Sequence, residues 1–163
     1  MKTSLSFFFS LLFIGFAHAA KVDTLNVQSS AMNKAIKTVI IQPEGSKSKE
    51  FPTLYLLHGY SGSYKDWVNK VPAIKDLADR LGIIIVCPDG GFGSWYWDIP
   101  NDKNFQYETF VAKELVAYVD QNYPVIKDRS KRGITGLSMG GHGALYLALR
   151  HQDTFGAAGS TAG

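Results

Sequence analysis

The run Arg132-Gly-Ile-Thr-Gly-Leu-Ser-Met-Gly-Gly-His-Gly-Ala-Leu145 decides how this chain of 163 residues folds. It contains the pattern Gly-x-Ser-x-Gly, centred on Ser138, between a short strand-like segment and a helix-like run that begins with small residues. The pattern predicts a sharp strand–turn–helix elbow with Ser138 at its apex. Glycines suit such a turn because side chains there would collide with the neighbouring strand and helix. The alternative is a glycine-rich strand–helix turn that merely contains a serine.

Elsewhere in the chain, apolar strand-like runs alternate with segments of helical spacing. Residues 52–57 and 83–87 are continuous apolar runs, typical of strands buried on both faces of a parallel sheet. Strands are expected at 22–27, 35–41, 52–57, 83–87, 133–137 and 155–160, and helices at 67–81, 105–122 and 140–150. The first two strands suit an antiparallel pair at a sheet edge. Strands joined by such helices imply right-handed parallel crossovers, so we predict an α/β fold with a mostly parallel sheet flanked by helices.

The helix expected at 67–81 carries signals at both ends. Ser63 and Asp66 have the spacing of a capping box at its start, and Gly82 suits its C-cap. Pro72 is an irregularity inside it.

Three loops follow the carboxyl ends of predicted strands. They are His58-Gly59-Tyr60, the long loop at 88–98, and the elbow at Ser138. Ligands of parallel α/β sheets bind at these strand ends. We therefore expect the three loops to meet at one edge of the sheet and to form the site there.

The residues of these loops fit the parts of an acyl-transfer site, which needs a nucleophile, a base, an orienting acid and oxyanion donors. Ser138 is the candidate nucleophile, and the backbone N–H groups of Met139 and Tyr60 are the candidate oxyanion donors. Each such donor is typically worth about 3 kcal/mol in the transition state. Gly59 lets the backbone turn toward the substrate. His58 is a candidate for bracing this loop, and both residues are candidates for contact with the substrate.

The base and the acid are harder to find. In this kind of site the order is serine, then Asp or Glu, then histidine, and only His142, His151 and Asp153 follow Ser138. His142 lies in the elbow helix, which aims the serine away from it, so we assign it to packing or to lining the pocket and not to proton transfer. His151 and Asp153 are expected at the surface. The chain is accordingly expected to be the N-terminal part, residues 20–163, of a hydrolase domain whose acid and histidine lie beyond Gly163.

Three other residues have open interpretations. Trp95 either lines the substrate pocket or packs in the core beneath its loop. Glu114 falls on the apolar side of its predicted helix, where a carboxylate needs a partner. A structural ion pair with Arg132 is favoured there over a catalytic role. Cys87, in an apolar strand, is expected to be a buried small hydrophobe.

The first twenty residues have the features of a secretory signal peptide. Lys2 supplies a positive charge, residues 5–16 are apolar, and Ala17-His18-Ala19 is a cleavage site. We expect residues 1–19 to be removed, which leaves no stable membrane span and a secreted or periplasmic protein; the alternative is an uncleaved anchor. The formal net charge of +3 is small and dispersed, so a nucleic-acid partner is not expected.

Four blocks of sequence together resemble a known family, the putative-esterase family of α/β-hydrolases. They are Leu57-His-Gly-Tyr-Ser-Gly-Ser-Tyr-Lys-Asp-Trp67, Pro88-Asp-Gly90, Ser94-Trp-Tyr-Trp-Asp98 and Gly136-Leu-Ser-Met-Gly-Gly-His-Gly-Ala144. The family includes esterase D (S-formylglutathione hydrolase), tributyrin and feruloyl esterases, and mycolyltransferases. The resemblance implies hydrolysis or transfer of acyl groups by a Ser-Asp-His triad without metal or cofactor. It matches Ser138 to the nucleophile and Met139 and Tyr60 to the oxyanion positions, whereas the family's Asp and His have no counterpart here.

These observations predict an exported serine esterase that forms an acyl-enzyme on Ser138 and acts on small or carbohydrate-linked esters. One alternative is an acyltransferase to a sugar or lipid alcohol, and another is a thioesterase of the S-formylglutathione type. A non-catalytic carbohydrate-binding or interaction domain with a vestigial elbow is the alternative from a different class. It predicts loss of Ser138 or Gly59, and both are present.

Overall fold

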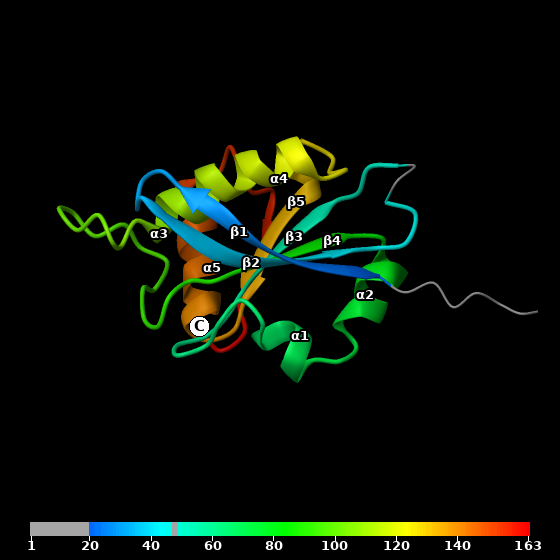
Figure 1. The fold of residues 1–163 in the computed structure, drawn as a ribbon, viewed down its shortest axis with the longest axis horizontal. Coiled ribbons are helices and arrows are strands. Elements are labelled where there is room, and N and C mark those ends of the chain that lie inside the picture. The colour runs from blue at the N-terminus through cyan, green and yellow to red at the C-terminus, as the bar shows by residue number, and fades with distance from the viewer. Residues whose placement is uncertain (1–19, 47–48) are drawn as a thin grey trace, which may run out of the picture.

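The computed structural model describes residues 20–46 and 49–163, which form a six-stranded sheet with helices on both faces (Figure 1). The predicted signal peptide lies outside the described residues. The strands are β1 (Lys21–Ser29), β2 (Lys34–Gln42), β3 (Thr53–Leu57), β4 (Ile84–Pro88), β5 (Arg132–Gly136) and β6 (Ala157–Ala158). The helices are α1 (Asp66–Lys70), α2 (Ile74–Leu81), α3 (Tyr107–Thr109), η1 (Phe110–Leu115), α4 (Val116–Asn122), η2 (Arg129–Lys131) and α5 (Met139–Arg150).

The sheet is mostly parallel, as predicted. Its strand order is β1-β2-β4-β3-β5-β6, and the pairs β3–β4, β3–β5 and β5–β6 are parallel. The hairpin β1–β2 is antiparallel, and β2 pairs antiparallel with β4. The strands β4, β3 and β5 are therefore parallel neighbours. The loops that follow them lie at the same edge of the sheet.

The central strands bury side chains on both faces, which explains their continuous apolar sequence. Tyr55 and Leu57 of β3 belong to a core on the side of α5 and the 107–122 segment. Leu56, between them, belongs to a second core with Ile74 and Ala78 of α2. Cys87 lies fully buried in that second core, where burial raises the pKa of its thiol to about 12. The thiol is therefore a packing group, as predicted.

The helix predicted at 67–81 is in fact two short helices, α1 and α2. Proline has no N–H to donate and restricts the residue before it, and Val71, just before Pro72, leaves the helical region at φ −125°. The predicted capping box is wrong: the Ser63 hydroxyl donates to the Asp66 carboxylate, and the N-cap residue is Lys65. Gly82 caps α2 with φ 59°, as predicted.

The helix predicted at 105–122 begins at Tyr107 and changes its hydrogen-bond pattern along its length. It starts as α3, passes through the π-helical segment η1 over Phe110–Leu115, and ends as α4. A π segment inserts a residue into the helical turn, so the positions after it rotate relative to a regular helix.

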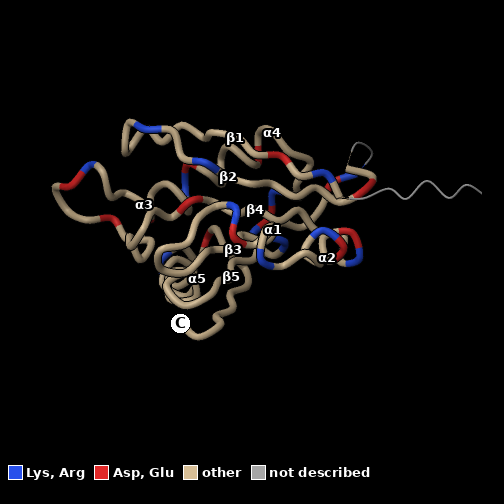
Figure 2. Tube along the Cα trace, turned by 60° about the horizontal axis from the view of Figure 1, so that its bottom comes forward, with Lys and Arg blue, Asp and Glu red and all other residues tan. Residues whose placement is uncertain are grey.

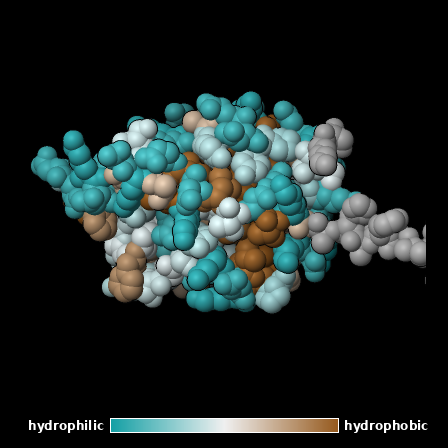
Figure 3. All heavy atoms as spheres, in the orientation of Figure 1, coloured by the Kyte–Doolittle hydropathy of each residue, from teal (hydrophilic) through white to brown (hydrophobic). Residues whose placement is uncertain are grey.

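Charges of both signs are interspersed along the described trace (Figure 2). Apolar side chains reach the surface beside α1 and α2 (Figure 3). Among the described residues, no helix is both long enough and apolar enough to cross a bilayer.

Candidate active site

The elbow at Ser138 has the predicted strand–turn–helix form. β5 ends at Gly136, Ser138 has φ 53° and ψ −119°, and α5 begins at Met139. A non-glycine residue at such a positive φ is uncommon and strained. A Cβ on Gly136 would lie 2.5 Å from the Gly140 carbonyl carbon, and one on Gly140 would overlap the Leu57 carbonyl oxygen. Both glycines are therefore required for close packing, and Ser138 stays exposed at the apex.

The loop after β3 lies against this elbow. A Cβ on Gly59 would lie 3.3 Å from the Leu137 carbonyl oxygen and 3.6 Å from the Ser138 Cβ. Within the described part of the chain, the backbone N–H groups of Tyr60 and Met139 donate to no protein acceptor. Both predicted oxyanion donors are therefore available to a substrate atom. The Tyr60 side chain is exposed and that of Met139 is fully buried, so what the two residues share at this site is an available backbone N–H.

His58 braces the loop from inside. Its side chain is buried, its Nε2 accepts a hydrogen bond from the Gly90 N–H at 2.8 Å, and its Nδ1 lies 2.8 Å from the Gly59 carbonyl oxygen. This pair of contacts assigns the proton to Nδ1. Because both ring nitrogens are engaged with backbone, the geometry favours the bracing role over direct contact of the ring with substrate.

Tyr96 links the three loops, and the sequence reasoning missed it. Its ring is fully buried and its hydroxyl donates to the His58 carbonyl oxygen at 3.1 Å. A Cβ on Gly143 of α5 would lie 2.5 Å from the Tyr96 ring, as would one on Gly90. Burial, opposed by the hydrogen bond to His58, raises the pKa of Tyr96 well above its usual value. The tyrosine therefore joins the 88–98 loop to α5 and to the loop after β3. We call this last loop, His58-Gly59-Tyr60, the oxyanion loop after its predicted role.

Trp95 lies at the surface, so its core-packing interpretation is wrong. It is 39% exposed, whereas Tyr96, the next residue, fills the space beneath the loop. Trp95 contacts Trp97 and His142 with ring centroids 6.4 and 5.4 Å away. His142 packs as expected, and its Nε2 accepts a hydrogen bond from the Trp97 indole N–H at 3.1 Å.

Glu108 is a buried carboxylate that contacts side chains at the C-terminal end of α5. The sequence reasoning missed it as well. It accepts hydrogen bonds from the Tyr146 hydroxyl at 2.9 Å and the Arg150 Nε at 2.8 Å. His151 Nε2 also lies 2.8 Å from this carboxylate. His151 is therefore partly buried and paired, and its expected surface position is wrong. Burial disfavours the Glu108 carboxylate, but these hydrogen bonds outweigh burial and hold the pKa of Glu108 below its usual range.

The predicted ion pair between Glu114 and Arg132 does not form. Glu114 accepts hydrogen bonds from the Ser29 hydroxyl and the Ala31 N–H, at the turn between β1 and β2. Arg132 instead pairs with Asp120, whose two carboxylate oxygens lie 2.9 and 2.8 Å from the Nη2 atom. Glu114 is half-buried and has partners, as its position on the apolar side of the helix required, but these partners are Ser29 and Ala31 and not Arg132.

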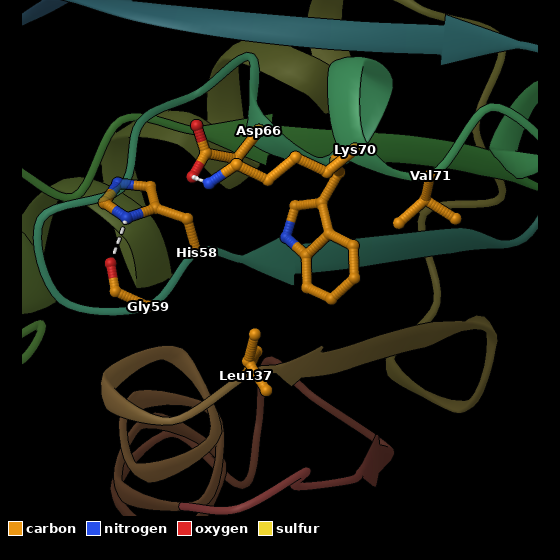
Figure 4. A pocket seen from close by; sticks show the side chains of 7 residues that line it. His58, Gly59, Asp66, Lys70, Val71 and Leu137 are labelled. Carbon is orange, nitrogen blue, oxygen red and sulfur yellow. Dashed lines mark hydrogen bonds and ion pairs between the residues drawn. The ribbon is translucent and has the colours of Figure 1, made fainter.

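A cleft of about 110 Å³ opens beside the oxyanion loop (Figure 4). Its lining residues come from the loop after β3, from α1 and from the elbow: His58, Gly59, Asp66, Trp67, Lys70, Val71 and Leu137. Asp66 is partly buried, which raises its pKa, but hydrogen bonds from Lys70 and Ser63 outweigh this and lower it overall. The cleft thus has an ionised carboxylate paired with Lys70 on one side and apolar Val71 and Leu137 elsewhere.

The arrangement presents a serine hydroxyl beside two available N–H donors. The three histidines in the described part are His58, His142 and His151, and each has a ring nitrogen in contact with another group. None of these three rings forms a hydrogen bond with the Ser138 hydroxyl in the described part of the chain. A serine hydroxyl beside two available N–H donors is the arrangement that the nucleophile and the oxyanion donors of an acyl-transfer site require.

Comparisons with known proteins agree with this geometry. Residues 29–163 match the model of the family described as "Putative esterase". An acetyl esterase of Caldicellulosiruptor saccharolyticus is 33% identical over 140 residues, which cover 80% of this chain and 52% of that protein. The diacylglycerol acyltransferase/mycolyltransferase Ag85A of Mycobacterium gordonae is 38% identical over 148 residues, which cover 85% of this chain and 42% of that protein.

Among solved structures, a ferulic acid esterase superposes with a TM-score of 0.75 at 35% identity, covering 85% of this chain and 58% of that one. The chain spans about half the length, or less, of the curated relatives that it matches. The similarity covers the whole candidate site, from the loop after β3 to the elbow, because the family match runs from residue 29 to residue 163.

Proposed function

Because the chain belongs to the putative-esterase family of α/β-hydrolases, we propose that Ser138 is the nucleophile of an exported serine esterase. The observation that carries the proposal is the elbow itself. Ser138 has φ 53°, lies between two glycines that tolerate no side chain, and stays exposed beside Gly59. A strained serine presented in this way is the arrangement that a nucleophile needs.

In the proposed reaction, the Ser138 Oγ attacks the carbonyl carbon of a carboxylic ester while a general base accepts its proton. The carbonyl π electrons move to oxygen, and the oxyanion accepts hydrogen bonds from the N–H groups of Tyr60 and Met139. The carbon–oxygen bond to the alcohol then breaks, the alcohol leaves with the proton, and an acyl-enzyme remains. Water repeats the sequence, which releases the acid and restores Ser138. The substrates would be small esters, free or linked to carbohydrate.

The experiment uses the full-length protein with a serine-reactive fluorophosphonate and short p-nitrophenyl esters. Ser138→Ala should abolish labelling and lower kcat by about 10⁴-fold, because a triad member is lost. Ser30→Ala, at an exposed turn serine, is the matched control and should change neither. Labelling that persists in Ser138→Ala, or that maps to Ser61 or Ser94, would refute the proposal.

Acyl transfer is the second candidate, favoured by the 38% identity to the mycolyltransferase relative. Such an enzyme would pass the acyl group from Ser138 to a sugar or lipid alcohol instead of to water. Product analysis in the presence of added alcohols separates the two, since a transferase yields the new ester in preference to the free acid.

Export is proposed from residues 1–19. The mature protein should begin at Ala20, in the secreted or periplasmic fraction. N-terminal sequencing of that fraction tests this, and recovery of a soluble protein beginning at Met1 would contradict it.

A further inference from the structure

A second open pocket, of about 300 Å³, lies beside the start of β2. β2 runs antiparallel to β4, with Thr38 opposite Pro88, so the start of β2 lies at the carboxyl end of β4. The pocket is therefore at the same edge of the sheet as the candidate active site, but it shares no lining residue with the cleft beside the oxyanion loop. Its lining residues come from β2, from the start of the 88–98 loop and from α3: Lys34, Ala35, Ile36, Lys37, Asp89 and Tyr107.

The ammonium group of Lys34 is half-buried in this pocket and has no acidic partner. Lys34 Nζ donates to the Asn104 carbonyl oxygen at 2.9 Å and to the Tyr107 hydroxyl at 3.3 Å. Within residues 20–46 and 49–163, no carboxylate lies within ion-pair distance of this nitrogen. An ammonium group has three N–H donors, so one of them remains available. A charge withdrawn from water needs a partner of opposite charge, so this nitrogen favours an anion.

The hydroxyl of Tyr107 provides a second donor beside this nitrogen. Tyr107 is only 6% exposed, and its oxygen accepts from Lys34, but its proton reaches no acceptor among the described residues. A buried polar group without a partner costs free energy, so this proton favours an added acceptor. Because Lys34 Nζ and the Tyr107 oxygen are 3.3 Å apart, the two oxygens of one carboxylate can accept from both groups at once.

Lys37 and Asp89 complete the polar lining. Lys37 is exposed, with its Nζ 5.6 Å from the centre of the Tyr64 ring, and no ion pair joins it to an acid in the described part of the chain. Asp89 Oδ1 accepts from the Gly91 N–H at 2.8 Å, whereas Oδ2 has no hydrogen bond to the described residues. That free oxygen can accept from a hydroxyl group. The lining has two positive groups and one negative group, so it suits a ligand with one negative charge and several hydroxyls.

We propose that this pocket binds a hydroxylated carboxylic acid of monosaccharide size, such as a uronic acid. The carboxylate accepts from Lys34 and Tyr107, a hydroxyl group of the ligand donates to Asp89, and Lys37 adds attraction at the rim. The pocket is larger than a carboxylate alone needs, since ligand pockets have volumes from about 300 Å³ upward. This inference goes beyond the proposed function, because it concerns binding and the ligand needs no ester bond.

The first experiment measures binding of galacturonate, galactose and acetate to the full-length protein by isothermal titration calorimetry. Galacturonate should bind with a Kd of about 1 mM, as expected for a well-matched ligand of this size. Galactose lacks the carboxylate and should bind at least about tenfold more weakly. Acetate lacks the hydroxyl groups and should bind at least about threefold more weakly. Galactose binding as tightly as galacturonate would overturn the proposal, and acetate binding as tightly would overturn the role of Asp89.

Two substitutions test the proposed donors. Lys34→Met keeps the apolar stem and removes the charge, and Tyr107→Phe keeps the ring and removes the hydroxyl. The first should weaken galacturonate binding by about tenfold or more and the second by about fivefold. Lys127→Met, at an exposed lysine between α4 and η2, is the matched control and should change nothing. Far-UV circular dichroism verifies that the variants are folded. Unchanged affinity in both pocket variants, or an equal loss in the control, would contradict the proposed site.

A last measurement separates this site from the active site. Ser138→Ala should bind galacturonate as tightly as the wild type does, because the pocket shares no lining residue with the elbow. Enzyme labelled by the fluorophosphonate should also bind galacturonate with unchanged affinity. Binding that disappears on labelling would place galacturonate at Ser138, which would overturn the inference and leave the esterase proposal standing. Binding that persists in a protein without esterase activity would support the pocket and count against the proposed function alone.

Discussion

The two ends of α5 are built in opposite ways. The first turns of the helix are rich in glycine, and Gly140, Gly141 and Gly143 let it lie directly against β3, the C-terminal segment and Tyr96. At its last turn long polar side chains, Arg150 and His151, reach a buried carboxylate on another helical segment. At the first end, close packing holds the backbone in place. At the second end, hydrogen bonds to the Glu108 carboxylate hold the side chains in place.

This difference shows which part of the site depends on shape and which on electrostatics. The elbow end tolerates no added atom, yet its interactions are backbone contacts that do not change with pH. The contacts at the Glu108 end require an ionised carboxylate. Loss of that charge would leave the packing of the elbow glycines unchanged. Substitutions at the two ends should therefore differ in size, in pH dependence and in their effect on Ser138.

The largest effect is expected at the elbow end. Gly140→Ala places a Cβ against the carbonyl groups of Leu57 and His58, which are backbone atoms that cannot move aside. Overpacking of this kind should lower the free energy of unfolding by about 3 kcal/mol, measured by urea denaturation. Gly133→Ala is the matched control, since the nearest atom to its Cβ would be Leu54 Cδ1 at 3.4 Å, and Ala157 would lie 3.7 Å away or more. If both variants lose the same amount, the close approach at the elbow does not limit stability.

A smaller effect is expected at the other end. Glu108→Gln keeps the shape of the side chain but removes the charge that accepts from Arg150, Tyr146 and His151. Hydrogen bonds to a charged group contribute about 2 kcal/mol, so the free energy of unfolding should fall by about that amount. Asp153→Asn, an exposed acid just beyond α5, should cost under about 0.5 kcal/mol. Equal losses from the two variants would mean that the Glu108 network adds nothing.

The same network predicts a pH dependence that the elbow lacks. The pKa of Glu108 is lower in the folded than in the unfolded chain, so its contribution is present above the unfolded value of about 4.3. It is lost as the pH falls through the lower, folded value. The stability difference between wild type and Glu108→Gln should therefore shrink below about pH 4 and be constant from pH 6 to 8. A difference that persists undiminished at pH 2 would contradict this.

The comparison also explains what could be predicted from the sequence. The elbow was predictable because its requirements are local: five residues carry the serine and both glycines, and the continuous apolar strands beside it bury both faces. The convergence of the three loops followed from parallel strand order alone. What the motif specified was backbone geometry, and that is the part confirmed by the structure.

The side-chain networks were not predictable because their partners are distant in sequence. Tyr146 and Glu108 are separated by 38 residues, as are Tyr96 and His58. No local pattern marks such pairs. The partner of Glu114 was predicted wrongly for the same reason, since Ser29 and Ala31 lie 85 and 83 residues away. The tight glycines Gly90 and Gly143 were the one available signal for Tyr96, because each leaves room for its ring.

The smallest effect on stability, and the most specific one on activity, is expected for Tyr96→Phe. The variant keeps the buried ring but removes the hydroxyl that donates to the His58 carbonyl oxygen, next to Gly59 and the proposed donor Tyr60. Losing one buried hydrogen bond should lower the free energy of unfolding by about 1 kcal/mol. Because the oxyanion loop would be held less firmly beside Ser138, kcat should fall about tenfold with little change in KM, since the donors act mainly in the transition state. Tyr118→Phe, whose hydroxyl has no hydrogen bond to the described part of the chain, is the control and should alter neither quantity. Unchanged kcat in Tyr96→Phe would show that the hydroxyl is only a packing contact and that the oxyanion loop is positioned by His58 and the glycines alone.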